Sequence, residues 1–189
     1  MSRYSHVQKV ESITFCGGEV FTLVKFPDLV NAMTEQGIIV QIITNGTIDR
    51  LEQLQNHNLV NLIISLDGQE SYHDKNRGTG NFRKSVTFAK KAHQLGCHVD
   101  VFSIVTHQNL INIENFESDL TRELGFVPNI TYHPRKPPSY LTVHPVSNIV
   151  GEIDEFEFLT HAEMLQLMKT KRVFQTSQLG CYQIALTSD

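Results

Sequence analysis

The sequence lacks any apolar run near the roughly 18 residues that a membrane-spanning helix needs. Its first twelve residues, MSRYSHVQKVES, contain no apolar signal core. It also lacks a cluster of lysine and arginine, and its formal net charge is −4, which disfavours a nucleic-acid binder or a membrane-surface protein. These absences predict a cytoplasmic chain that has neither nucleic acid nor a membrane as its partner.

Cysteine is also scarce. Cys16, Cys97 and Cys181 are odd in number and far apart, so they fit neither a disulfide framework nor a C-x-x-C metal site. Each cysteine taken alone is expected to be a small buried residue. None of the nine histidines forms an i, i+4 pair around an acid, which disfavours a zinc site.

What is present is an alternation of apolar runs and helical patterns. With 40% hydrophobic and 19% charged residues, the chain can bury a core. The apolar runs are nearly continuous, which is typical of strands buried on both faces. Strands are expected at 12–18, 38–46, 59–68, 98–106 and 128–134, and helices at 24–36, 48–56, 82–95 and 111–124. This alternation predicts right-handed βαβ units and a parallel sheet.

The character of the sequence changes after Pro134. Residues 135–158 include three of the six prolines and are expected to form an extended connector. An amphipathic helix follows, with Thr160 as its N-cap and Glu163 as the capping-box partner. Residues 182–189 are expected to begin a further strand.

Polar residues follow each predicted strand. Since functional loops leave the carboxyl ends of parallel strands, these clusters are expected to meet on one rim. The clusters are Gly17-Gly18-Glu19, Thr44-Asn45-Gly46, Ser65-Leu66-Asp67-Gly68, Thr106-His107-Gln108-Asn109 and Tyr132-His133.

The pair Gly17-Gly18 would let the backbone approach a ligand closely. Glu19 could pair with an amine or orient the loop, and the alternative is a tight turn with a solvated acid. Asn45 precedes a glycine, and a role as a turn former is favoured over a role in ligand binding.

Ser65 and Asp67 are expected on the same side of their strand, where they could hold sugar hydroxyls or an amino-acid head group. Arg77 lies in a segment expected to be a glycine-rich loop, from which it could bind a carboxylate through two parallel hydrogen bonds. The alternative for Arg77 is a surface ion pair with Asp74.

Taken in order, ITFCGGEV, IITNGT, ISLDG, YHDKNRGTGNFRKS and VTHQN resemble the radical S-adenosylmethionine (SAM) superfamily. The sequence is most similar to the branch that carries an auxiliary iron–sulfur (SPASM/twitch-like) extension and includes peptide- and protein-modifying enzymes. The resemblance implies an α/β fold, a partial (β/α)6 TIM-like barrel with its first strand missing, over residues 1–134. Residues 135–189 would be the connector, the helix and the start of the auxiliary region.

The resemblance also implies roles for the rim. Gly17, Gly18 and Glu19 match the family motif that binds the methionine amino group of SAM, although Val20 replaces the usual proline. By the same resemblance, SAM binds across the carboxyl ends of the strands.

Ser65 and Arg77 match the residues that hold the SAM carboxylate. Asn45 and Asp67 lie where contacts to the ribose or to the substrate are expected.

One family motif, C-x-x-x-C-x-x-C, is absent from this sequence. Its three thiolates would hold a 4Fe-4S cluster, and in the family it precedes the position of Ser12. The resemblance therefore implies a fragment or truncated product that is not active alone. Cys181 matches the first auxiliary-cluster cysteine but is followed by no partner cysteine.

In the intact enzyme, the resemblance implies reductive cleavage of SAM to a 5′-deoxyadenosyl radical, which abstracts hydrogen from a peptide or protein. A flavodoxin- or ferredoxin-like protein would donate the electron. The first alternative is a cluster-free relative that binds SAM or a peptide without radical chemistry. The second, an aldolase-type or phosphate-binding barrel, is disfavoured because no lysine lies near the strand ends.

Overall fold

One parallel sheet forms the centre of the protein. The computed structural model describes residues 10–135 and 157–173. All neighbouring strands are parallel and lie side by side in chain order, which confirms the predicted α/β fold. The strands are β1 (Ser12–Phe15), β2 (Ile39–Thr44), β3 (Val60–Ser65), β4 (His98–Val105) and β5 (Asn129–Pro134).

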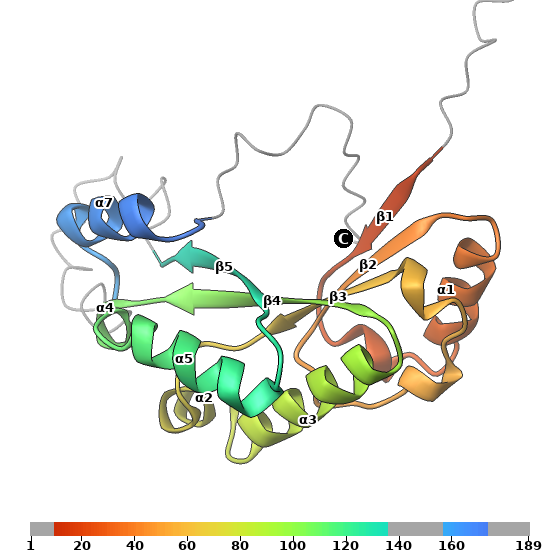
Figure 1. Ribbon diagram of the computed structural model, residues 1–189, viewed down its shortest axis with the longest axis horizontal. Coiled ribbons are helices and arrows are strands. Elements are labelled where there is room, and N and C mark those ends of the chain that lie inside the picture. The colour runs from red at the N-terminus through yellow and green to blue at the C-terminus, as the bar shows by residue number, and fades with distance from the viewer. Residues whose placement is uncertain (1–9, 136–156, 174–189) are drawn as a thin grey trace, which may run out of the picture.

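α-Helices lie in the connections after β1, β3 and β4, whereas β2 and β3 are joined by 3-10 turns alone. Helices α2, α3 and α5 lie on one side of the sheet (Figure 1). The helices are α1 (Phe26–Thr34), α2 (Glu70–Arg77), α3 (Asn81–Gln94), α4 (His107–Leu110), α5 (Ile113–Leu124) and α7 (His161–Thr170). Short 3-10 turns occur at Val20–Thr22, Leu51–Gln53 and His57–Leu59. No helix in the described ranges is long and apolar enough to cross a membrane.

Side chains of successive strand residues lie on opposite faces of the sheet. The face toward the helices forms the main core with α1, α3 and α5. Its buried strand residues include Val40, Ile42, Leu62, Ile64, Val99 and Val101, and it is only partly buried at β1 and β5. The opposite face, called the open face here, carries Gln41, Asn61, Ile63, Ser65, Asp100, Phe102, Ile104 and Thr131. Most open-face side chains are only half-buried.

Residues 157–173 continue the strand–helix alternation. Thr160 and Glu163 form the predicted capping box at the start of α7. After α7, Val173 makes a parallel bridge to Tyr132 of β5. Both side chains lie in a second small core with Leu167. The helix therefore packs against the sheet, whereas most of the expected connector, the expected strand at 182–189 and Cys181 lie outside the described residues.

The helix predicted at 48–56 is wrong, because that segment contains only short 3-10 turns. The Asp49 carboxylate accepts the amide of Leu51 and so competes with helical bonding. Asn31 of α1 binds the carbonyl of Gln53 at 2.9 Å. Asn56 then adopts a left-handed conformation with φ of 39°, which ends any helical path.

The glycine-rich loop predicted around Arg77 is also wrong in part. Residues Glu70–Arg77 form α2, which ends where Gly78 adopts a φ of 101°. Helix α2 is strongly polar, and His73 is its one fully buried residue. The apolar periodicity that identifies most surface helices is therefore missing from this segment.

Candidate functional site

The loops at the carboxyl ends of β1 to β4 are tied together by side chains of the predicted clusters. Glu19 binds the loop after β2, Asp67 binds β4 and α2, and Asn109 binds the loop after β3. These bonds place the clusters on one edge of the sheet, which we call the rim.

Gly17 and Gly18 expose backbone at the end of β1. Gly17 has φ of 143°, a conformation that residues with a side chain rarely adopt. A Cβ built on either glycine would meet no heavy atom within 4 Å. The space beside both residues is therefore open to a ligand, whereas side chains at these positions would fill it.

Glu19 joins the first two loops of the rim. Its Oε1 accepts the amide of Phe21 at 3.1 Å, and its Oε2 accepts the amide of Asn45 at 2.8 Å. The hydroxyl of Thr44 lies 2.8 Å from Oε1 and 2.9 Å from Oε2. The structure therefore supports the loop-orienting interpretation of Glu19 and keeps its negative charge beside the two glycines.

Asn45 forms a local turn and retains an amide group. Its Oδ1 accepts the amide of Thr47 at 2.9 Å and the hydroxyl of the same residue at 2.7 Å. The backbone carbonyl of Asn45 accepts the hydroxyl of Ser85 in α3. In the described residues, the side-chain nitrogen of Asn45 makes no hydrogen bond, so it can still donate to a ligand.

Ser65, the last residue of β3, is 9% exposed. Its hydroxyl makes no hydrogen bond to any described residue, and its oxygen is not among the buried atoms that lack a partner. Two residues later, Asp67 is 6% exposed and accepts the amide of Ile104 at 2.9 Å. The two side chains thus differ, since the Ser65 hydroxyl has no hydrogen-bond partner among the described residues, whereas the Asp67 carboxylate already accepts a hydrogen bond.

Arg77 is held by Asp67. The Nε of Arg77 lies 2.5 Å from Asp67 Oδ2, and the two side chains are 27% and 8% exposed. The alternative pairing with Asp74 does not occur, because Asp74 instead accepts the amides of Gly80 and Phe82. Within the described ranges the terminal nitrogens of Arg77 make no hydrogen bond, so they can bind a carboxylate.

His73 supports this arrangement and was missed by the sequence reasoning. It is 1% exposed, and its Nδ1 accepts the amide of Asp67 at 3.2 Å. Burial lowers the pKa of His73 from its ordinary value, and the nearby Asp67 opposes this shift. The neutral ring therefore carries its proton on Nε2, and a histidine six positions after Asp67 was the only sequence signal.

The polar cluster after β4, which contains Thr106 and Asn109, connects the loops that follow β3 and β4. Asn109 Nδ2 donates to the carbonyls of Asp67 and Ile104, at 3.2 and 2.9 Å. Asn109 Oδ1 accepts the amide of Thr106, whose side chain caps α4. These bonds fix the loops after β3 and β4 relative to each other.

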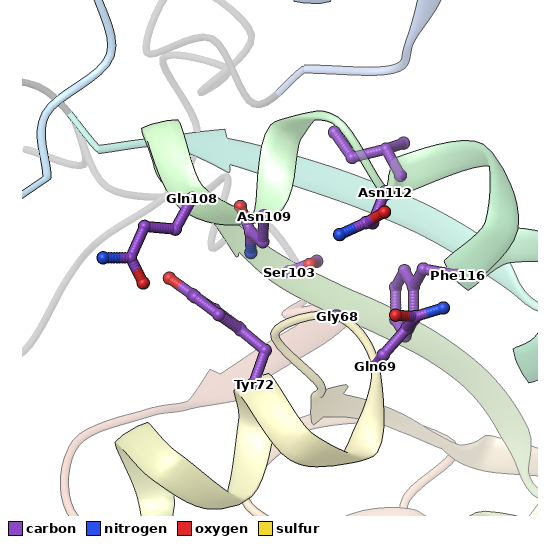
Figure 2. A pocket seen from close by; sticks show the side chains of 9 residues that line it. Gly68, Gln69, Tyr72, Ser103, Gln108, Asn109, Asn112 and Phe116 are labelled. Carbon is purple, nitrogen blue, oxygen red and sulfur yellow. The ribbon is translucent and has the colours of Figure 1, made fainter.

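A small polar cavity lies behind the rim, between α2 and the start of α5. Its volume is about 30 Å³, and its walls include Gly68, Tyr72, Ser103, Asn109 and Phe116. Figure 2 shows Tyr72 extending from α2 toward Gln108. This volume has room for about one or two water molecules, and is therefore too small for SAM.

A larger groove of about 730 Å³ lies between α4, α5 and α7. His107 Nδ1 and Glu163 Oε1 lie 2.5 Å apart across it. None of the rim residues Glu19, Asn45, Ser65, Asp67 or Arg77 lines this groove, so it is separate from the candidate site.

The described cysteines cannot share a metal cluster. Cys16 follows β1 at the carboxyl edge of the sheet, whereas Cys97 precedes β4 at the amino edge. The predicted burial is confirmed for Cys97 and wrong for Cys16, which is exposed. Burial raises the pKa of Cys97 to about 11, which disfavours the thiolate that iron requires. No group of metal-binding side chains occurs within residues 10–135 and 157–173.

Comparison with known proteins identifies relatives of this arrangement. The family model for the radical SAM superfamily matches residues 2–121. A search of curated proteins finds no match.

Three solved structures are similar in fold. Streptococcus suis SuiB bound to S-adenosylmethionine is 20% identical, with a TM-score of 0.55 over 65% of this chain and 29% of SuiB. SuiB bound to its precursor peptide SuiA is 19% identical, with a TM-score of 0.55 over 65% of this chain and 28% of SuiB. Native anSMEcpe with bound AdoMet and Kp18Cys peptide is 15% identical, with a TM-score of 0.59 over 84% of this chain and 44% of that chain. This chain thus spans less than half the length of each.

Proposed function

This chain belongs to the radical SAM superfamily, and on that premise we propose that its rim binds SAM as part of a peptide-modifying enzyme. The single observation that carries the proposal is the presence on one rim of the Ser65 hydroxyl, which makes no hydrogen bond to a described residue, and of a guanidinium that Asp67 holds through one nitrogen. A hydroxyl and two free guanidinium nitrogens are suitable donors for a carboxylate.

The SAM carboxylate is therefore assigned to Ser65 and Arg77. Arg77 is only partly exposed, so a bound carboxylate would be shielded from water, which strengthens the ionic contact. Asp67 fixes the orientation of Arg77 by accepting its Nε. We accordingly propose that Asp67 acts by positioning Arg77, since its own oxygens leave little surface for a ribose.

The methionine amino group is assigned to the end of β1. The open space beside Gly17 and Gly18 would let an ammonium group reach backbone carbonyls. Glu19 supports this assignment with a negative charge that Thr44 and the amide of Asn45 hold in place. The free amide of Asn45 would then contact the ribose or the substrate.

An iron–sulfur cluster supplies the electron that cleaves SAM in this superfamily. The described cysteines do not fit such a cluster, because they lie at opposite edges of the sheet. The step proposed for this chain is therefore the binding and orientation of SAM. In an intact enzyme, a flavodoxin- or ferredoxin-like donor would reduce a cluster that the described residues of this chain do not hold.

A peptide substrate is proposed by analogy with similar folds. SuiB has been crystallised with a precursor peptide, and anSMEcpe with the Kp18Cys peptide. Their barrels resemble the sheet described here. In this chain the open face of the sheet lies below the rim and would receive part of the peptide.

The decisive experiment is calorimetric titration of the chain with SAM, with and without anaerobic reconstitution by iron and sulfide. We expect SAM binding that weakens in Arg77→Ala and persists in Arg122→Ala, which removes an exposed arginine paired with Asp119. Binding without iron would favour the cluster-free relative over a fragment of a larger enzyme. Equal SAM affinity in the wild type and Arg77→Ala would overturn the assignment of the site.

A further inference from the structure

The open face of the sheet carries one carboxylate. Among the residues of β1 to β5, Asp100 is the only acid, and none is lysine or arginine. Asp100 lies in the middle of the sheet, where its neighbours in register are Ile63 of β3 and Asn129 of β5. Histidine is therefore the only basic residue type in these strands that could balance the charge of Asp100.

Asp100 is poorly satisfied by its neighbours. Its Oδ2 accepts one long hydrogen bond of 3.3 Å from Asn61 Nδ2. Its Oδ1 and the Oδ1 of Asn61 are both buried and make no hydrogen bond to a described residue. His98 Nε2 lies 3.2 Å from Asp100 Oδ1 but is on the amino-terminal side of Asp100, and its side chain is 63% exposed. Among the described residues, the Asp100 carboxylate thus has one long hydrogen bond and one nearby imidazole nitrogen, which leaves it capacity for a further donor.

Apolar side chains separate Asp100 from the rim. Phe102 follows it on the same face of β4 and is level with Ser65 of β3. The Phe102 ring packs against His133 with centroids 5.6 Å apart. Two residues of strand span about 7 Å, so Asp100 lies about that far below the row of Ser65. A ligand entering from the rim would pass Phe102 and Ile63 before reaching the carboxylate.

We propose that the open face binds a lysine side chain of the peptide substrate, with its ammonium group on Asp100 and Asn61. This inference rests on the proposed function, because it assumes a peptide that enters beside SAM. A lysine has an apolar stem that suits Phe102 and Ile63, and its head group carries three donors. The length of the stem matches the depth of Asp100 below the rim.

Two blocked amino acids test the proposal on the full chain. N-acetyl-lysine N-methylamide and N-acetyl-norleucine N-methylamide share the stem and differ in the ammonium group. We expect the wild type to bind the lysine probe about tenfold more tightly, the ratio that one charged hydrogen bond supports. Nuclear magnetic resonance titration should show shifts at Asp100, Phe102 and Ile63.

Asp100→Asn removes the charge and should reduce the preference for the lysine probe to less than about twofold. Asp28→Asn makes the same chemical change at an exposed position of α1 and should keep the full preference. Equal binding of the two probes by the wild type would overturn the proposal without any variant. Retention of the preference in Asp100→Asn, or displacement of the lysine probe by equimolar Mg²⁺, would also overturn it.

SAM affinity is measured in the same samples. The proposal expects SAM to bind the wild type and Asp100→Asn equally well, because Asp100 lies below the SAM contacts. Loss of SAM binding in every sample, with the lysine preference intact, would contradict the proposed function and leave the Asp100 site supported.

Discussion

Asp67 holds Arg77 through Nε at 2.5 Å and leaves both terminal nitrogens of the guanidinium without a partner in the described part of the chain. Asp67 is itself fixed by the amide of Ile104 and donates its own amide to His73. One buried carboxylate thus connects β3, β4 and α2, and it presents an oriented cation at the rim.

Arg77→Ala is expected to weaken SAM binding by about 1–3 kcal/mol, the usual cost of losing a charged hydrogen bond. Arg77→Lys should recover little, because an ammonium cannot form the paired contact of a guanidinium. Calorimetric titration measures both variants, with Arg122→Ala as the matched loss of an exposed arginine. An unchanged dissociation constant in Arg77→Ala would remove Arg77 from the site.

Ser65→Ala is expected to weaken SAM binding by about 1–3 kcal/mol while leaving the free energy of unfolding nearly unchanged. The reason is that the Ser65 hydroxyl makes no hydrogen bond within the described residues. Ser85→Ala is the contrasting variant, since the Ser85 hydroxyl binds the carbonyls of Asn45 and Asn81. Urea denaturation and SAM titration together separate the two effects, and a large loss of stability in Ser65→Ala would contradict the expectation.

Gly18→Val is expected to abolish SAM binding without unfolding the chain. The new side chain meets no protein atom within 4 Å of its Cβ, so it would occupy only ligand space. Gly17→Val should in addition lower the melting temperature, because Gly17 has φ of 143° and a branched residue is strained there. Thermal unfolding and SAM titration distinguish the variants, and tight SAM binding by Gly18→Val would exclude contact with this backbone.

The stability of the fold is expected to decrease in mild acid because of His73. Burial lowers its pKa below the ordinary 6.5, so the unfolded chain takes up a proton more readily than the folded one. Neutral His73 contributes fully to the free energy of unfolding above pH 6.5, and this contribution is lost as the pH falls through the lower pKa of the folded protein. The free energy of unfolding changes by at most about 1.4 kcal/mol per pH unit in this range.

Urea denaturation between pH 5 and pH 8 measures this dependence. His73→Gln keeps an acceptor for the amide of Asp67 and should reduce the slope, whereas His161→Gln changes an exposed histidine and should not. Nuclear magnetic resonance titration of the wild-type ring gives the pKa of His73 directly. A value at or above 6.5 would contradict the prediction.

The strands could be predicted from the sequence because buried parallel strands are nearly continuous apolar runs. Strands β1 to β4 end earlier than predicted, since the polar residues after Phe15 and Thr44 leave the sheet to form the rim, whereas β5 ends at Pro134 as predicted. The helix expected at 24–36 begins only at Phe26, where Pro27 supplies a favourable first turn.

The predicted helix at 48–56 and the predicted loop around Arg77 were wrong for a common reason, which is that tertiary contacts override the local sequence pattern. Leu51 and Leu54 have helical spacing, but their backbone is directed by long-range bonds from Asn31. Helix α2 lacks apolar periodicity because it buries an imidazole, His73, in place of aliphatic side chains. The rim clusters were predictable from topology, whereas the partners of Glu19 and Asp67 depend on loop conformations that no local pattern specifies. The assignments of individual rim residues to SAM stay predictions.

The sequential order of the strands has a consequence for how the chain folds. Each strand pairs with the one that precedes it along the chain, and Val173 begins to extend the same series beside β5. Each of β2 to β5 therefore has the strand that it pairs with already synthesised when it leaves the ribosome. Because the loops that close between neighbouring strands are short, the sheet can grow during synthesis by one strand and its connection at a time.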